Sequence, residues 1–101
     1  MGPILWLMTG IILFLGSNPS ILALAEYHIS RAGYQAEGFL EEDAVIQRLN
    51  AGGVMLLILG PGVEDGARVH MRTYCHEHAI KLLEHYGGPG ALLESVETVL
   101  N

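Results

Sequence analysis

Two uninterrupted apolar blocks constrain the fold of this chain most strongly. Residues 11–15 (Ile, Ile, Leu, Phe, Leu) lie between Gly10 and Gly16, and residues 54–59 (Val, Met, Leu, Leu, Ile, Leu) are closed by Gly60-Pro61-Gly62. Continuous apolar runs of this length are typical of strands that are buried on both faces, as in a parallel sheet. We therefore predict a sheet that is covered by helices on both faces and has these two strands at its centre.

The rest of the chain alternates between helical and extended patterns. The predicted strands are residues 11–16, 34–40, 54–59 and 80–86, and the predicted helices are residues 21–32, 41–51, 64–78 and 91–100. Ser17 or Ser20 is suited to cap the first helix, with Pro19 near its first turn and Gly33 at its end. Successive strand–helix units in one small domain predict a parallel sheet with right-handed crossovers.

Composition limits the size and the class of the protein. The chain has 101 residues and a formal net charge of -6, with 11 acidic residues against 5 Lys and Arg. This length suits one domain, and the acidic balance argues against a nucleic-acid partner, which needs a basic surface. The single cysteine, Cys75, excludes an intramolecular disulfide framework and a zinc site built on several thiolates.

The first charged residue is Glu26, so the opening of the chain has three possible interpretations. A membrane span needs about 20 apolar residues in a row, and a signal peptide begins with a basic region that this chain does not have. The breakers at residues 17–20 favour a buried strand over both, so we expect a cytoplasmic protein without a membrane partner. Residues 1–10 are predicted to be an apolar extension of a single domain, residues 11–101. The extension has three readings: an additional edge strand, a helical arm on a partner, or a segment outside the domain.

Four stretches of the chain together resemble one known family. They are Ile11–Pro19, Ala32-Gly33-Tyr34, Val54–Gly66 and His85–Leu93. Each stretch is similar to a part of a response-regulator receiver domain. The first resembles its first strand and following loop, and the second resembles the turn into its second strand. The third resembles its third strand with the Pro-Gly loop, and the fourth resembles its last strand and helix. The resemblance implies a flavodoxin-like three-layer α/β sandwich. Because the chain is about one strand–helix unit shorter than a receiver, it implies a four-stranded parallel sheet in the order 2-1-3-4.

The departures from this family concern its chemistry. A receiver holds Mg²⁺ with a pair of acids after its first strand, where this chain has Gly16 and Ser17, and no phospho-accepting Asp ends the third strand. Magnesium needs carboxylate oxygens, and an acyl phosphate needs a carboxylate nucleophile. We therefore expect a non-enzymatic, receiver-like (pseudo-receiver) module without a cofactor. Its expected role in signalling is protein–protein interaction, with a homodimer that covers the sheet edges and the apolar extension.

The alternative is a ligand-binding domain that uses the loops at the carboxyl ends of the strands. Such loops meet at the topological switch point of an open α/β sheet, where ligands bind. The residues that we would test first are Ser17, Asn18, Glu64 and His85. The same loops need glycine, serine, asparagine and proline for backbone reasons alone, and neither GxGxxG nor a P-loop lysine indicates a nucleotide.

The His-rich stretch around Cys75 could belong to a metal-binding version of that alternative. Cys75 and His78 share one helical face, and a third ligand would have to come from His70 or His85. The competing interpretation is a polar helix end, where histidine suits the macrodipole. A cysteine in the middle of a helix is more often a small buried residue than a nucleophile. We predict no metal and no catalytic residue.

Overall fold

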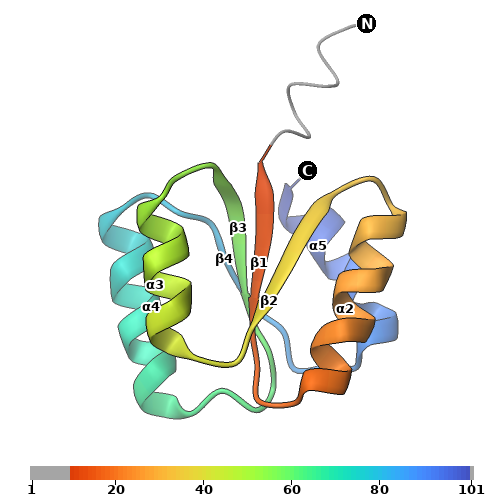
Figure 1. The fold of residues 1–101 in the computed structure, drawn as a ribbon, viewed down its shortest axis with the longest axis horizontal. Coiled ribbons are helices and arrows are strands. Elements are labelled where there is room, and N and C mark those ends of the chain that lie inside the picture. The colour runs from red at the N-terminus through yellow and green to blue at the C-terminus, as the bar shows by residue number, and fades with distance from the viewer. Residues whose placement is uncertain (1–9, 101) are drawn as a thin grey trace, which may run out of the picture.

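The computed structural model describes residues 10–100, and the predicted α/β architecture is confirmed there. The elements are β1 Ile11–Leu15, α2 Pro19–Arg31, β2 Gln35–Phe39, α3 Glu42–Asn50, β3 Val54–Leu59, α4 Asp65–Glu77, β4 Leu82–Glu84, a short 3₁₀ turn Pro89–Ala91 and α5 Leu92–Leu100. The four strands form one parallel sheet in the order β2-β1-β3-β4, as predicted. The fold is a flavodoxin-like three-layer sandwich (Figure 1).

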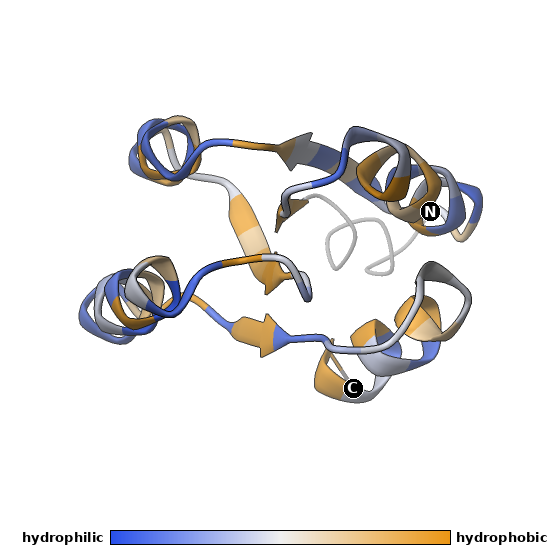
Figure 2. Ribbon diagram, turned by 90° about the horizontal axis from the view of Figure 1, so that it is seen from below, coloured by the Kyte–Doolittle hydropathy of each residue, from blue (hydrophilic) through white to orange (hydrophobic). Residues whose placement is uncertain are grey.

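The two apolar blocks are the central strands β1 and β3, and each contributes to two separate cores. Alternate side chains along a strand point to opposite faces. Ile12 and Phe14 therefore pack with α2 and α5, whereas Leu13 and Leu15 pack with α3 and α4. Figure 2 shows this layering from below, with the hydrophobic strands between the two pairs of helices. This burial on both faces is the reason that the two blocks have no polar residue.

The first helix is capped by a residue that the sequence analysis did not choose. We expected Ser17 or Ser20, but the N-cap is Asn18, with Pro19 in the first turn as predicted. The Asn18 side-chain oxygen accepts hydrogen bonds from the backbone N–H groups of Ser20 (2.9 Å) and Ile21 (3.2 Å). Asparagine is among the strongest N-caps, and its position directly before proline fits the preference for proline at the first helical position.

The fourth strand is shorter than the predicted residues 80–86. Only Leu82–Glu84 pairs with β3, opposite Leu57–Leu59. Ala79 has a positive φ of 56°, and the backbone N–H of Ile80 donates to the carbonyl of Cys75 at 2.9 Å. The end of α4 therefore leads directly into a tight turn, and Ile80 is used to pack against the α3/α4 core.

Gly10 and Leu100 both lie at the amino edge of the sheet, opposite the ends of β1 and β3 (Figure 1). A side chain at position 10 has no space, since an added Cβ would lie 2.7 Å from the Cβ of Met55. The predictions for residues 1–9 fall outside the described residues. Between residues 10 and 100 no helix combines the length and the hydrophobicity that a membrane crossing requires.

Candidate binding site

Three of the four predicted ligand residues line one cavity at the carboxyl edge of the sheet. Ser17 and Asn18 reach it from the loop after β1, and His85 reaches it from the end of β4. The volume of the cavity is about 270 Å³. Its other lining residues are Phe14, Gly16, Ile21, Leu22, Ala25, Ile58, Gly60, Pro61, Gly62, Gly87, Gly88 and Leu92. None of the lining residues is Asp, Glu, Lys or Arg, and most of them are apolar or glycine.

The loops after β1 and β3 touch each other beside this cavity. A Cβ added at Gly62 would lie 1.9 Å from the hydroxyl oxygen of Ser17 and 3.0 Å from its Cβ. A side chain at position 62 would therefore displace the Ser17 hydroxyl, which occupies the place that a Cβ would need. The backbone N–H of Gly60 also donates to the carbonyl of Leu15 at 2.9 Å. The two loops form one wall of the cavity.

Asn18 has a structural role that limits what the helix terminus can bind. Its side-chain oxygen already occupies the free N–H groups of Ser20 and Ile21, and Pro19 has no N–H to offer. The amides that would hold an anion at a helix N-terminus are therefore engaged at α2. The other half of the Asn18 amide, the NH₂ group, is a donor that this cap does not use, and Asn18 is one of the lining residues of the cavity.

His85 is fixed by the loops on both sides of it. Its backbone N–H donates to the carbonyl of Leu59 at 2.9 Å, which extends the sheet by one further bond. Its ring Nε2 lies 3.1 Å from the carbonyl oxygen of Gly88, so the proton is on Nε2 when this bond forms. Nδ1 is then an acceptor when the ring is neutral.

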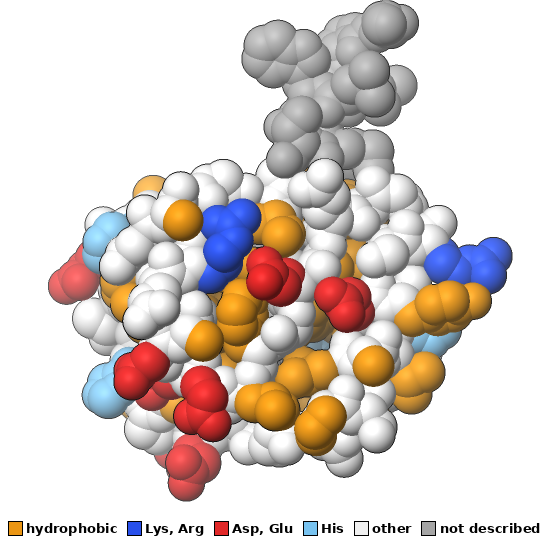
Figure 3. Space-filling model, viewed as in Figure 1, with side chains coloured by type: hydrophobic (Ala, Val, Ile, Leu, Met, Phe, Trp, Pro, Cys, Tyr) orange, Lys and Arg blue, Asp and Glu red, His pale blue; other side chains and the backbone are white. Residues whose placement is uncertain are grey.

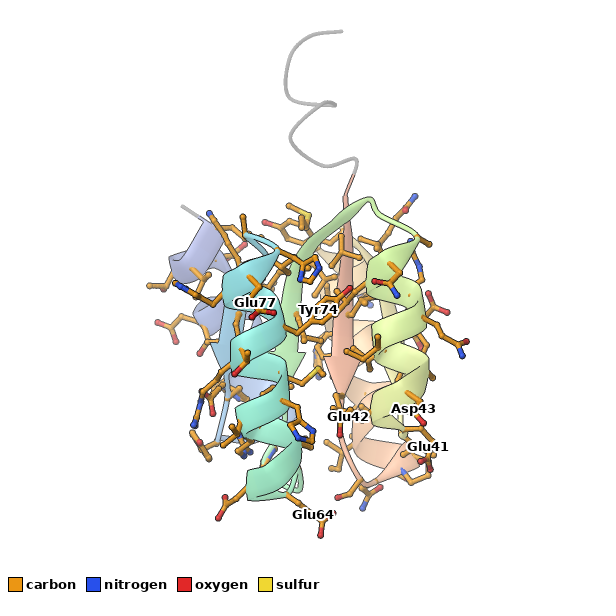
Figure 4. All side chains as sticks on the ribbon, turned by 90° about the vertical axis from the view of Figure 1, so that its left-hand side faces the viewer. Glu41, Glu42, Asp43, Glu64, Tyr74 and Glu77 are labelled. Atoms are coloured by element: carbon orange, nitrogen blue, oxygen red, sulfur yellow. The ribbon has the colours of Figure 1, made fainter. Side chains whose placement is uncertain are left out.

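Glu64 does not join the other three residues. It lines a separate hollow between the start of α3 and the start of α4, together with Glu41 and Glu42. Figure 4 shows these acids at the lower end of the two helices, with Glu64 at the tip of the α4 terminus. Ser17 borders both this hollow and the cavity. Asp43 and Asp65 lie in the first turns of α3 and α4, where the helix macrodipole favours acids.

The residue that organises the carboxyl edge, Arg68, was missed by the sequence analysis. Its side chain is 5% exposed, and it is the one charged residue in the buried part of the described core. Nε donates to the carbonyl of Val63 at 3.0 Å, and one terminal nitrogen donates to the carbonyl of Gly60 at 2.5 Å. The guanidinium thus fixes the loop between β3 and α4 from inside. No short motif marks this arginine, which stands in an ordinary helical sequence.

Arg68 belongs to a network that also includes Glu84, Arg72 and Tyr86. Glu84 Oε1 accepts from Arg68 at 3.0 Å, and the same carboxylate accepts two hydrogen bonds from Arg72, at 2.6 and 2.8 Å. The Tyr86 ring lies 4.7 Å from the guanidinium carbon of Arg68. The hydrogen bonds from Arg72, and with them those from Arg68, lower the pKa of Glu84 to about 2. Glu84 is therefore ionised at neutral pH and joins β4 to α4.

The His-rich stretch does not assemble a metal site within residues 10–100, where no group of three His, Cys, Asp or Glu side chains is placed to hold an ion. Cys75 is buried in the α3/α4 core, and burial raises the pKa of its thiol to about 11. His78 follows α4 and stacks on Tyr74, with ring centroids 4.0 Å apart. His70 lies on α4 with its ring 3.0 Å from Glu42 of α3.

Comparisons of this chain with protein-family models, with curated proteins and with solved structures found no match. The interpretation of the site therefore depends on its own geometry. That geometry combines a small, mainly apolar cavity lined also by Ser17, Asn18 and His85 with a buried arginine network that fixes the adjacent loop.

Proposed function

We propose that this chain is a non-enzymatic, receiver-like module in signalling that acts by binding protein, first of all a second copy of itself. One observation carries the proposal: a buried guanidinium, that of Arg68, is bonded to the carbonyl of Gly60 at the end of β3. A receiver has its phospho-accepting carboxylate at the end of this strand. A cation in this position disfavours Mg²⁺ by repulsion, and the residues at the end of β1 are Gly16 and Ser17.

The acids at this edge are unsuited to replace the missing pair, and one of them, Glu84, is already bonded to Arg68 and Arg72. Glu41, Glu42 and Glu64 lie at the starts of α3 and α4 and line the separate hollow, on the far side of the Ser17–Gly62 contact. A phosphoryl transfer site needs its carboxylates converging on one metal ion beside the nucleophile. This separation supports a role in binding rather than in phosphotransfer.

The arginine network supports a constant binding surface rather than a switched one. Receivers act through loops that change position on phosphorylation, whereas here Arg68 bonds two carbonyls of the loop after β3 and the carboxylate of Glu84 at the same time. Moving that loop would leave a buried cation without its partners, and an unpaired buried charge is costly. The loop is therefore held in one arrangement.

The surface best suited to a second copy is the outer stripe of α2. Ile21, Leu24 and Tyr27 are 40, 47 and 54% exposed and recur at helical spacing. Figure 3 shows hydrophobic side chains gathered over this side of the molecule. The first turn of α2 has no acidic residue, although the chain has a net charge of -6. Arg31 donates to the hydroxyl of Tyr27 at 2.9 Å, so the charge beside these three residues is basic. Two acidic copies repel each other least where a stripe without acidic members meets its equivalent, as in a symmetric dimer.

Sedimentation velocity tests the partner. The wild type should form a dimer, Leu24→Glu should be a monomer, and Thr73→Glu should remain dimeric, since Thr73 is an exposed residue of α4 on the other face. Both variants add the same charge to an exposed helix. A monomeric wild type, or equal dissociation of the two variants, would contradict the dimer.

Incubation with acetyl phosphate and Mg²⁺ tests the chemistry. Intact-mass analysis should find no phosphoryl adduct on the wild type, because no carboxylate is placed to accept one at the end of β3. A stoichiometric, Mg²⁺-dependent adduct would refute the non-enzymatic assignment. A receiver domain that has its phospho-accepting Asp, treated in parallel, establishes that the reagent is active.

A further inference from the structure

The cavity at the carboxyl edge has the character of a ligand site rather than of a packing defect. Its floor consists of side chains from three elements of the α2/α5 core, among them Phe14, Ile58 and Leu92, which are 3, 2 and 3% exposed. Its mouth is formed by Ser17, Asn18 and His85. An apolar interior with a few convergent polar groups is the usual composition of small-molecule sites.

The walls of the cavity are held in place before any ligand arrives. Asn18 caps α2, Arg68 fixes the carbonyl of Gly60, and the ring of His85 is bonded to the carbonyl of Gly88. A site that is already ordered loses little conformational entropy on binding. The cavity is therefore able to bind a small molecule without rearrangement of the loops.

Volume and charge restrict the class of ligand. An engineered apolar cavity of about 150 Å³ holds one benzene ring, so the volume of about 270 Å³ here suits one or two fused rings. The lining has no Asp, Glu, Lys or Arg, and a charged group that loses its water without a partner pays a large desolvation cost. The Ser17 hydroxyl, the Asn18 NH₂ group and the His85 ring can each bond one neutral polar substituent.

We propose that this cavity binds a small, uncharged aromatic molecule of one or two rings, with its rings against Phe14 and Ile58 and its polar group at the mouth. Ile21 belongs both to the lining of this cavity and to the α2 stripe, but ligand binding here does not depend on the proposed function. A dimer without ligand binding, or ligand binding by a monomer, would separate the two proposals.

Titration of the ¹⁵N-labelled protein with indole and with phenol tests the proposal. At least one of the two should bind with a dissociation constant below about 1 mM and should shift the amide signals of Gly87 and Gly88. Benzoate and benzylamine, which have one ring and a charge, should bind at least about tenfold more weakly. Absence of binding by both neutral probes, or tighter binding by the charged ones, would overturn the proposal.

Two matched variants of α2 locate the binding. Ala25→Leu should abolish binding, because Ala25 is 5% exposed and its added carbons enter the cavity. Ala23→Leu makes the same change at an exposed position of the same helix and should bind as the wild type does. Equal effects of the two changes would refute the location.

A second measurement on the wild type covers the case in which Ala25→Leu does not fold. Nuclear Overhauser contacts from the ring protons of the neutral probe that binds, indole or phenol, to the methyl groups of Ile58, Leu22 and Leu92 should appear in the complex. Contacts that map only to other methyl groups would overturn the proposal.

Discussion

The replacement of Glu84 by glutamine should reveal how much of the stability of the fold depends on one ionised carboxylate. Glutamine has the same shape and can still accept from Arg68, so the change removes charge and little volume. In the wild type, hydrogen bonds from Arg72 and Arg68 hold the pKa of Glu84 near 2, against an ordinary value of 4.5. The folded protein therefore stabilises the ionised form of Glu84.

The magnitude follows from linkage between protonation and folding. One pKa unit corresponds to about 1.4 kcal/mol, so the full shift sets an upper limit of about 3.5 kcal/mol at neutral pH. The Glu84 side chain is 22% exposed, and solvent screening reduces this value. We expect Glu84→Gln to lower the free energy of unfolding by about 1–2 kcal/mol at pH 7, or the melting temperature by about 4–16 °C for a domain of this size.

The pH dependence has a definite sign. Because the folded pKa is below the unfolded one, the stabilisation is complete above about pH 4.5 and is lost as the pH falls toward 2. The difference between wild type and Glu84→Gln should therefore shrink across this window and nearly vanish at its acid end. Glu97, an exposed residue of α5 beyond its first turn, provides the control, and Glu97→Gln should change stability little at any pH.

Urea unfolding followed by far-ultraviolet circular dichroism, repeated from pH 7 to pH 2, measures these differences directly. A gap between wild type and Glu84→Gln that stays constant with pH would refute the reasoning, since the loss would then come from packing and not from charge. A control variant that behaves like Glu84→Gln would refute it equally.

Three further predictions concern single contacts. Gly62→Ala should destabilise the fold by about 1–3 kcal/mol because its Cβ clashes with the Ser17 hydroxyl. The double variant Gly62→Ala with Ser17→Gly should regain most of this stability. Thermal unfolding that shows no such rescue would exclude the clash as the cause. Asn18→Ala should lower the free energy of unfolding by about 1 kcal/mol, and Asn18→Asp, which keeps the cap, should lower it much less. Equal melting temperatures of the wild type and both variants would contradict the capping role of Asn18. Cys75 is buried with its pKa raised to about 11, so a thiol reagent at neutral pH should label it slowly in the folded protein and rapidly in urea, and rapid labelling of the folded protein would contradict its burial.

The parts of the fold that were predictable from sequence are those with a strong one-dimensional pattern. The blocks at residues 11–15 and 54–59 are apolar without interruption because β1 and β3 are central and buried on both faces. The glycines at the ends of these blocks could be recognised as turn residues, because they interrupt the apolar pattern. The extent of β4 could not be predicted from the sequence. Its start depends on how the chain turns at Ala79 after α4, and its length depends on the three residues of β3 with which it pairs.

The candidate site was predictable where chain connectivity decides it and not where three-dimensional contacts do. Ser17 and His85 follow parallel strands, so the topology places both at one edge. Glu64 follows the same rule, but its side chain turns toward the starts of α3 and α4. Arg68 has no local signature at all. Its importance comes from carbonyl groups and a carboxylate that only the folded chain brings to it.

The positions of the described chain ends have a practical meaning. Gly10 and Leu100 lie at the amino edge of the sheet, and the cavity and the arginine network lie at the carboxyl edge (Figure 1). A tether that leaves the domain at either end points away from the cavity. The described domain, residues 10–100, can therefore be fused at either end with its carboxyl edge left open to solution.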